Sequence, residues 1–150
     1  MDSDGQLKSF LDRYAPVVAS DARQALNFLH ARMPTATRLV YDNYNALVVG
    51  FGPSDKASDA ILSIAVYPSY ASLFFLNGVK LSDPHHLLEG KGSKVRHIKL
   101  RPISRLQNLE TLALLEAAVT NAHVPLPTCG VGNLVIKSIS AKQRPRRVGD

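Results

Sequence analysis

The sequence predicts an α+β fold, with one antiparallel sheet of about five strands and three helices on one face of that sheet. Apolar residues first recur with helical spacing, then with the alternation of strands, and then with helical spacing again after residue 105. The strand-like segments follow one another mostly over short turns, which favours antiparallel pairing because a parallel pair needs a long crossover. Runs of strands separated from runs of helices are typical of α+β folds.

Two helices are expected before the strands. One apolar face of the first consists of Leu7, Phe10, Leu11 and Tyr14. Ser3 and Gln6 have the spacing of a capping box at its start. Pro16 suits the first position of the second helix, and Pro34 ends it because the residue before a proline is pushed out of helical geometry.

Five strand-like segments then occupy the middle of the chain. They cover residues 38–44, 46–51, 61–67, 71–76 and 95–100. Asn43 or Asn45 fits a tight turn between the first two, since Asn tolerates a left-handed backbone. Helical spacing returns over about 105–122. The expected order is therefore helix, helix, five strands, helix.

The 150 residues are expected to form a single domain over residues 1–125, followed by a basic and partly disordered extension over residues 126–150. Residues 134–136 fit a short edge strand. Cys129 is the only cysteine, which excludes an intrachain disulfide and a Cys-rich metal site and suits a reducing compartment. Apolar runs fall short of the ~20 residues that a membrane span needs. We expect a cytoplasmic protein without a membrane partner.

A positive charge points to polyanions as one class of partner. The formal net charge is +6, and residues 91–105 contain no acidic side chain. The candidate polyanion-binding residues in this stretch are Lys91, Lys94, Lys99, Arg101 and Arg105. Aromatic residues of the kind that stack on nucleic-acid bases do not interleave with them in the sequence. The alternative is a solvated strand face followed by a solvated basic tail.

Residues 73–100 carry a family resemblance. The shared pattern consists of Phe74-Phe75, Gly78, Leu81-Ser-Asp83-Pro84, Leu88-Glu89-Gly90 and Arg96-His97-Ile98-Lys99-Leu100. With this pattern the chain resembles the YdhG-like family, a bacterial domain family largely without assigned function, over about residues 41–119. The resemblance implies terminal helices around an antiparallel sheet, similar to frataxin. It also implies a role in iron handling, because one branch of the family serves as a frataxin-like intracellular iron chaperone.

The loop within this pattern contains a weak candidate metal site. Asp83, His85, His86 and Glu89 combine carboxylate and imidazole groups that suit iron, zinc or another divalent ion. Their spacing matches no known metal motif. The simpler interpretation is that Asp83 caps a short turn over residues 85–88.

Arg96 has two interpretations. In the first, Asp83, Glu89, Gly90 and Arg96 form a structural clamp that holds the loop closed, with Glu89 as the partner of the Arg96 guanidinium. In the second, Arg96 binds an anionic ligand in a pocket over the sheet.

The second interpretation requires a pocket lined by Arg96, Tyr44 and Tyr67. No catalytic constellation is recognisable, since no base or activating group is fixed near Cys129 and no nucleophile-elbow motif occurs. We therefore expect a non-enzymatic binding or accessory protein without a cofactor. An iron chaperone and a basic nucleic-acid-associated protein are the two alternatives, and the partner is a polyanion or a protein.

Overall fold

The computed structural model describes residues 1–149 and has the α+β class that the sequence predicts. Its helices are α1 (Ser3–Asp12), α2 (Pro16–Arg32) and α3 (Leu109–Thr120). Its strands are β1 (Thr37–Asp42), β2 (Leu47–Gly52), β3 (Leu62–Val66), β4 (Ala71–Phe75), β5 (Arg96–Lys99) and β6 (Leu134–Ile139). Three short 3₁₀ turns complete the set, η1 (Ala57–Asp59), η2 (Gly78–Lys80) and η3 (Ile103–Gln107). None of the helices in this part of the chain is long and apolar enough to cross a membrane.

The sheet is mixed rather than purely antiparallel. Its strand order is β5-β4-β3-β2-β1-β6, and neighbours among β1 to β5 pair antiparallel as expected. The sixth strand, β6, pairs parallel with β1. The connection through α3 is long enough for the crossover that a parallel pair needs. The segment expected as a separate extension thus supplies one edge of the sheet.

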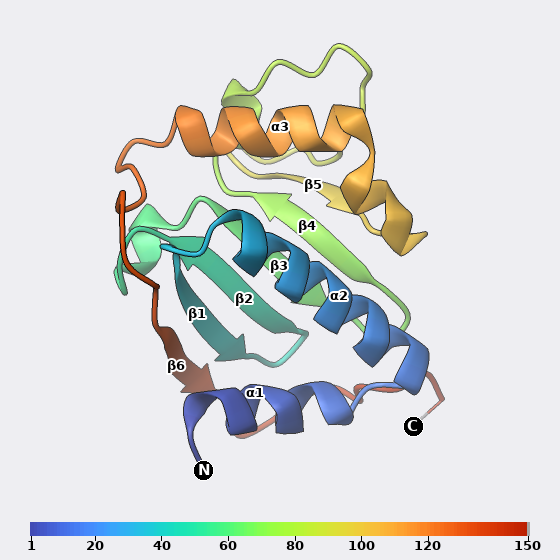
Figure 1. Cartoon of the computed structure of the whole chain (residues 1–150). Coiled ribbons are helices and arrows are strands. Elements are labelled where there is room, and N and C mark those ends of the chain that lie inside the picture. Colours follow the sequence, from blue (N-terminus) through green and yellow to red (C-terminus); the bar gives the residue numbers. More distant parts are fainter. Residues whose placement is uncertain (150) are drawn as a thin grey trace.

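All three helices contribute to a hydrophobic core on one face of the sheet (Figure 1). The strand side chains alternate, as a half-buried sheet requires. In β3, for example, Leu62, Ile64 and Val66 belong to this core, whereas Ser63 and Ala65 point to the other face. Figure 1 shows α2 crossing in front of the strands, α3 lying near β5 and β4, and α1 lying near the ends of β1 and β6.

Two helix starts differ from the sequence prediction. Asp2, not Ser3, caps α1, because its Oδ1 atom accepts the Gly5 N–H at 2.8 Å while Ser3 is already helical. The third helix is shorter than the expected residues 105–122. Residues 103–107 instead form η3, and the extended backbone of Asn108 separates this turn from α3.

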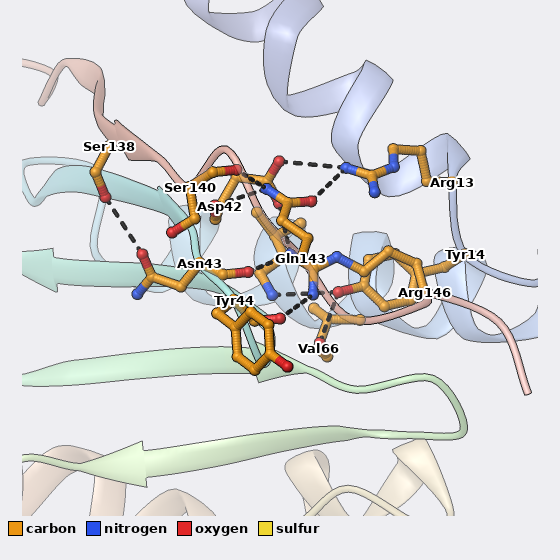
Figure 2. Close-up of polar contacts among 11 residues, drawn as sticks. Arg13, Tyr14, Asp42, Asn43, Tyr44, Val66, Ser138, Ser140, Gln143 and Arg146 are labelled. Atoms are coloured by element: carbon orange, nitrogen blue, oxygen red, sulfur yellow. Dashed lines mark hydrogen bonds and ion pairs between the residues drawn. The ribbon is translucent and has the colours of Figure 1, made fainter.

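The C-terminal tail folds back onto the end of β1 (Figure 2). The Arg146 Nη2 atom donates to Asp42 Oδ1 at 3.0 Å, and both side chains are only 2% exposed. Arg146 also donates to the carbonyl groups of Asn43 and Tyr44 in the β1–β2 turn. Its Nε atom is buried without a hydrogen-bond partner. This arginine joins the tail to the first hairpin of the sheet.

Other tail contacts reach the corner between α1 and α2. The Gln143 Nε2 atom donates to the Asp42 carbonyl at 2.9 Å, and its Oε1 atom accepts from Arg13 at 2.7 Å (Figure 2). The Arg147 Nε atom donates to the Arg13 carbonyl at 3.0 Å. Residues 143–147 therefore have defined partners, in contrast to the expectation of a partly disordered tail.

Replacing Arg146 should strongly destabilise the protein. Arg146→Met leaves the buried Asp42 carboxylate with only the longer contact to Arg13, at 3.4 Å. Breaking a buried ion pair from one side costs about 3–5 kcal/mol of the free energy of unfolding. Arg147→Met is the matched control, because Arg147 is exposed and contacts only backbone. Urea denaturation measures both, and a loss below about 1 kcal/mol for Arg146→Met would contradict the role of the pair.

Tyr14 connects the helical corner to the adjacent ends of β2 and β3. Its hydroxyl donates to the Val66 carbonyl at 2.7 Å and accepts the Leu47 N–H at 3.2 Å. The side chain is among the largest that are fully buried. Burial raises the pKa of Tyr14 above its ordinary value of 10.0, and the Leu47 N–H only partly opposes this.

The raised pKa of Tyr14 predicts a loss of stability in alkali. The folded protein holds this proton more tightly than the unfolded chain, so the contribution is complete below about pH 10 and is lost as pH rises through the folded-state pKa. Tyr14→Phe should weaken this pH dependence and should cost about 1–3 kcal/mol at neutral pH. Part of the alkaline pH dependence of stability remains in Tyr14→Phe, since burial also raises the pKa of Tyr67. Equal alkaline slopes for wild type and Tyr14→Phe would refute the assignment.

Candidate functional site

The face of the sheet opposite the helices forms a candidate binding surface. Strand register places its side chains in two rows that cross the sheet. One row contains Tyr41, Val48, Ala65, Ser72 and Lys99. The other contains Leu39, Gly50, Ser63, Phe74 and His97. Neither row contains an acidic residue, so these strand positions present apolar, aromatic, hydroxyl and basic groups.

Two aromatic pairs lie on this face near β4. The rings of Tyr67 and Tyr70 have centroids 5.1 Å apart, and those of Phe74 and His97 stack at the same distance. Tyr70 and Phe74 are four residues apart along an extended chain, which corresponds to about 13 Å. The two pairs therefore lie on either side of one cross-strand row.

The floor between the aromatic pairs consists of small side chains. Ala65 and Ser72 are directly opposite one another and are only 3% and 1% exposed. The Ser72 hydroxyl donates to the Ile98 carbonyl at 3.1 Å and is thereby satisfied within the protein. These small side chains are covered by the larger ones around them, and the rings of Tyr67, Tyr70 and Phe74 stay partly exposed.

Two cations lie beside Tyr70 of the first aromatic pair. The Lys99 Nζ atom lies 5.8 Å from the Tyr70 ring centroid, and the Arg101 guanidinium lies 5.2 Å from it. Both distances fall in the range of cation–π contacts. Burial, with a smaller contribution from Tyr70, raises the pKa of Tyr67. This phenol is therefore uncharged at neutral pH and does not repel an anion.

Only part of this face is open. The loop at residues 53–60 folds over the opposite end of β2, where a Cβ atom on Gly52 would lie 2.9 Å from Ala60 Cα. Gly50 is also close, with a Cβ position 3.8 Å from Ala60 Cβ. The Lys137 Nζ atom donates to the Asp55 carbonyl at 3.0 Å and ties this loop to the β6 segment. The accessible surface therefore lies toward the β3–β4 turn. We call Tyr67, Tyr70, Phe74, His97, Lys99 and Arg101 the aromatic-basic surface.

The predicted ligand pocket of Arg96, Tyr44 and Tyr67 is not formed. Arg96 pairs with Phe75 at one end of the sheet. Tyr44 and Tyr67 follow β1 and β3 at the other end. The Tyr44 ring also points away from the buried ion pair, to which this residue contributes only its carbonyl (Figure 2). Of the three residues, only Tyr67 belongs to the aromatic-basic surface.

The loop clamp forms differently from the prediction. The Arg96 Nη1 atom donates to the Gly92 and Val95 carbonyls at 2.6 and 2.8 Å, and no ion pair with Glu89 occurs within residues 1–149. Glu89 instead exchanges backbone hydrogen bonds with His97. Gly90 has a φ of 124°, which favours glycine. Backbone groups, rather than the Glu89 carboxylate, hold this loop closed.

The candidate metal residues do not assemble into a metal-binding group. The Asp83 carboxylate accepts the Leu87 and Leu88 N–H groups, each at 2.9 Å, which agrees with the simpler turn-capping interpretation. His85, His86 and Glu89 are exposed in the same loop. Within residues 1–149 no group of three or more His, Cys, Asp or Glu side chains is arranged to hold a metal ion.

The predicted basic residues lie at the β5 edge of the sheet and in the loop before it, and the basic tail lies elsewhere. Lys99 and Arg101 lie at the β5 edge, and the Arg105 Nη1 atom donates to the Lys99 carbonyl at 2.8 Å. Lys91 and Lys94 lie in the preceding loop. The arginines of the tail lie at the end of the sheet that holds the β1–β2 turn, where Arg144 is 5.7 Å from the Tyr44 ring centroid and Arg146 contacts Asp42.

Sequence reasoning missed the aromatic part of this surface. The basic stretch lacks interleaved aromatic residues along the chain, but antiparallel pairing brings Tyr70 and Phe74 of the preceding strand segment beside Lys99 and His97. The signal in the sequence was the antiparallel pairing of the strands predicted over residues 71–76 and 95–100, which places these aromatic and basic side chains side by side. Comparisons with family models, curated proteins and solved structures found no match to the chain.

Removing the Arg96 side chain should open its loop. Arg96→Leu deletes both hydrogen bonds to loop carbonyls, so trypsin should cleave after Lys91 and Lys94 severalfold faster than in wild type. Arg32→Leu is a control on the helical side. Mass spectrometry of the early fragments identifies the cleavage sites, and unchanged cleavage rates there would contradict the clamp.

Proposed function

We propose that this protein is a non-enzymatic binding protein that contacts single-stranded nucleic acid through the aromatic-basic surface. The observation that carries the proposal is the pairing of Tyr67 with Tyr70 beside the Lys99 and Arg101 cations. Aromatic rings stack on unpaired bases, while nearby cations attract the phosphate backbone. Single-strand binding needs both base stacking and phosphate attraction, and here the rings and the cations lie on one face of the sheet.

The arrangement of the surface supports an unpaired strand as the ligand. The Phe74–His97 stack and the Tyr67–Tyr70 pair provide two separate aromatic positions over a floor of small side chains. Bases in a duplex are stacked on one another and leave no free face for such positions. The lack of acidic residues in the two cross-sheet rows reduces repulsion of phosphates.

The YdhG-like resemblance and a frataxin-like relationship remain predictions. An iron-chaperone role rests on that resemblance alone, since the candidate metal residues form no metal-binding group within residues 1–149. The aromatic-basic surface instead supports the nucleic-acid alternative. Of the predicted polyanion-binding residues, only Lys99 and Arg101 belong to this surface. Lys91 and Lys94 lie in the preceding loop and add a weaker attraction for phosphates.

Binding can be measured by fluorescence anisotropy with a labelled oligo(dT) of about eight nucleotides, within the range of known single-strand site sizes. Tyr70→Ala and Phe74→Ala should each weaken binding by about 1–3 kcal/mol through loss of base stacking. The double change Lys99→Gln/Arg101→Gln should reduce the slope of log K against log salt concentration by about 1.4, since each phosphate contact on a single strand contributes about 0.7.

The matched control is Arg32→Gln. Arg32 also lies over an aromatic ring, 5.6 Å from the Phe28 centroid, but on α2 in the helical layer. This change removes one positive charge without touching the proposed surface, so the salt slope and affinity should stay close to those of wild type. The proposal fails if oligo(dT) does not bind at low salt, or if Arg32→Gln weakens binding as much as the double change Lys99→Gln/Arg101→Gln does.

A further inference from the structure

A cavity lies at the end of the sheet that is distant from the β3–β4 turn. It has a volume of about 300 Å³ and is bounded by three segments, which are η1, the residues around η2, and the end of α3 with the residues that follow it. Ile61 and Phe75 contribute to its lining and also belong to the hydrophobic core. The cavity therefore lies at the end of the sheet between the loop that contains η1 and the end of α3, and its lining shares no residue with the aromatic-basic surface.

The interior of this cavity is mainly apolar. Ala118, Ala122 and Val124 line it from the α3 side, and Leu76 and Leu81 line it from the segment around η2. A volume near the lower end of those usual for small-molecule sites suits a compact ligand rather than a polymer. The ligand should thus have an apolar body.

Two lysines give the cavity a polar side. The Val79 N–H donates to the Lys94 carbonyl at 2.9 Å, so the backbone holds Lys94 beside η2 and close to Lys80 in the lining. Both lysines are exposed, and neither forms an ion pair within residues 1–149. Asp59 also lines the cavity, from η1, and His123 lines it beyond α3. Two lysine charges against one carboxylate leave the lining with a net positive charge.

We propose that this cavity binds a small apolar carboxylate. The apolar body lies between η1 and the end of α3, and the carboxylate pairs with Lys80 and Lys94. Charge complementarity selects an anion, because the ligand carboxylate gives the two lysines the partner that they lack within the described chain. The apolar walls select a hydrocarbon body over a polar one.

The test uses 4-phenylbutyrate, with the uncharged 4-phenylbutanamide as its matched probe. Two-dimensional ¹H–¹⁵N NMR of the full chain follows the amides of Asn77, Ala122 and His123 during titration. The acid should shift these amides saturably, with a Kd of about 1 mM or lower, and the amide should bind about tenfold more weakly or worse. No saturable shift with the acid, or equal binding of acid and amide, would overturn the proposal.

Variants locate the site. Lys80→Met/Lys94→Met should weaken binding of the acid about tenfold or more, and Ala122→Leu should weaken both probes because it fills the cavity without altering a charge. Lys91→Met is the matched control, since Lys91 is an exposed lysine of the same loop outside the lining. The spectra also report whether each variant is folded. A loss of binding in Lys91→Met equal to that in the double variant would overturn the proposal.

Discussion

The buried ion pair of Asp42 and Arg146 is the interaction on which the rest of the structure depends. It joins the end of β1, the β1–β2 turn and the tail, and through Arg13 and Gln143 it also reaches the corner between α1 and α2. Removing two charges from water is costly, so such a pair requires further hydrogen bonds to compensate. Neighbouring carbonyl groups supply most of them to Arg146. The pair fixes where the tail lies after the chain has crossed from β5 at one edge of the sheet to β6 at the other.

This crossing determines which surfaces remain available for binding. Because α3 carries the chain over the same face that α1 and α2 cover, the opposite face has no helical layer. Only the loop at residues 53–60 covers part of it, and the contact of Lys137 with Asp55 ties that loop to the β6 segment. The aromatic rings near β4 are left half exposed. The same topology places the end of α3 near η1 and η2, and the cavity lies between these three segments.

The spacing of apolar residues along the sequence predicted most of the helices and strands. The features that it did not predict depend on contacts between residues that are distant in the sequence. Apolar periodicity located the first two helices and five strands. It could not predict that β6 pairs parallel with β1, because the partner of an edge strand depends on the path of the chain through α3. Nor could it identify Arg146 among several tail arginines, since its partner Asp42 is 104 positions away. Glu89 was the wrong partner for Arg96 because nearby carbonyl groups were closer acceptors.

The parallel edge strand also has a consequence for synthesis of the chain. During translation β1 appears long before β6, so one edge of β1 stays without a strand partner, and Asp42 stays without Arg146, while about a hundred residues are added. At synthesis rates of about 5–20 residues per second, that interval lasts about 5–20 s. Unpaired strand edges promote aggregation. The nascent hairpin of β1 and β2 therefore exposes an unpaired strand edge until the tail emerges.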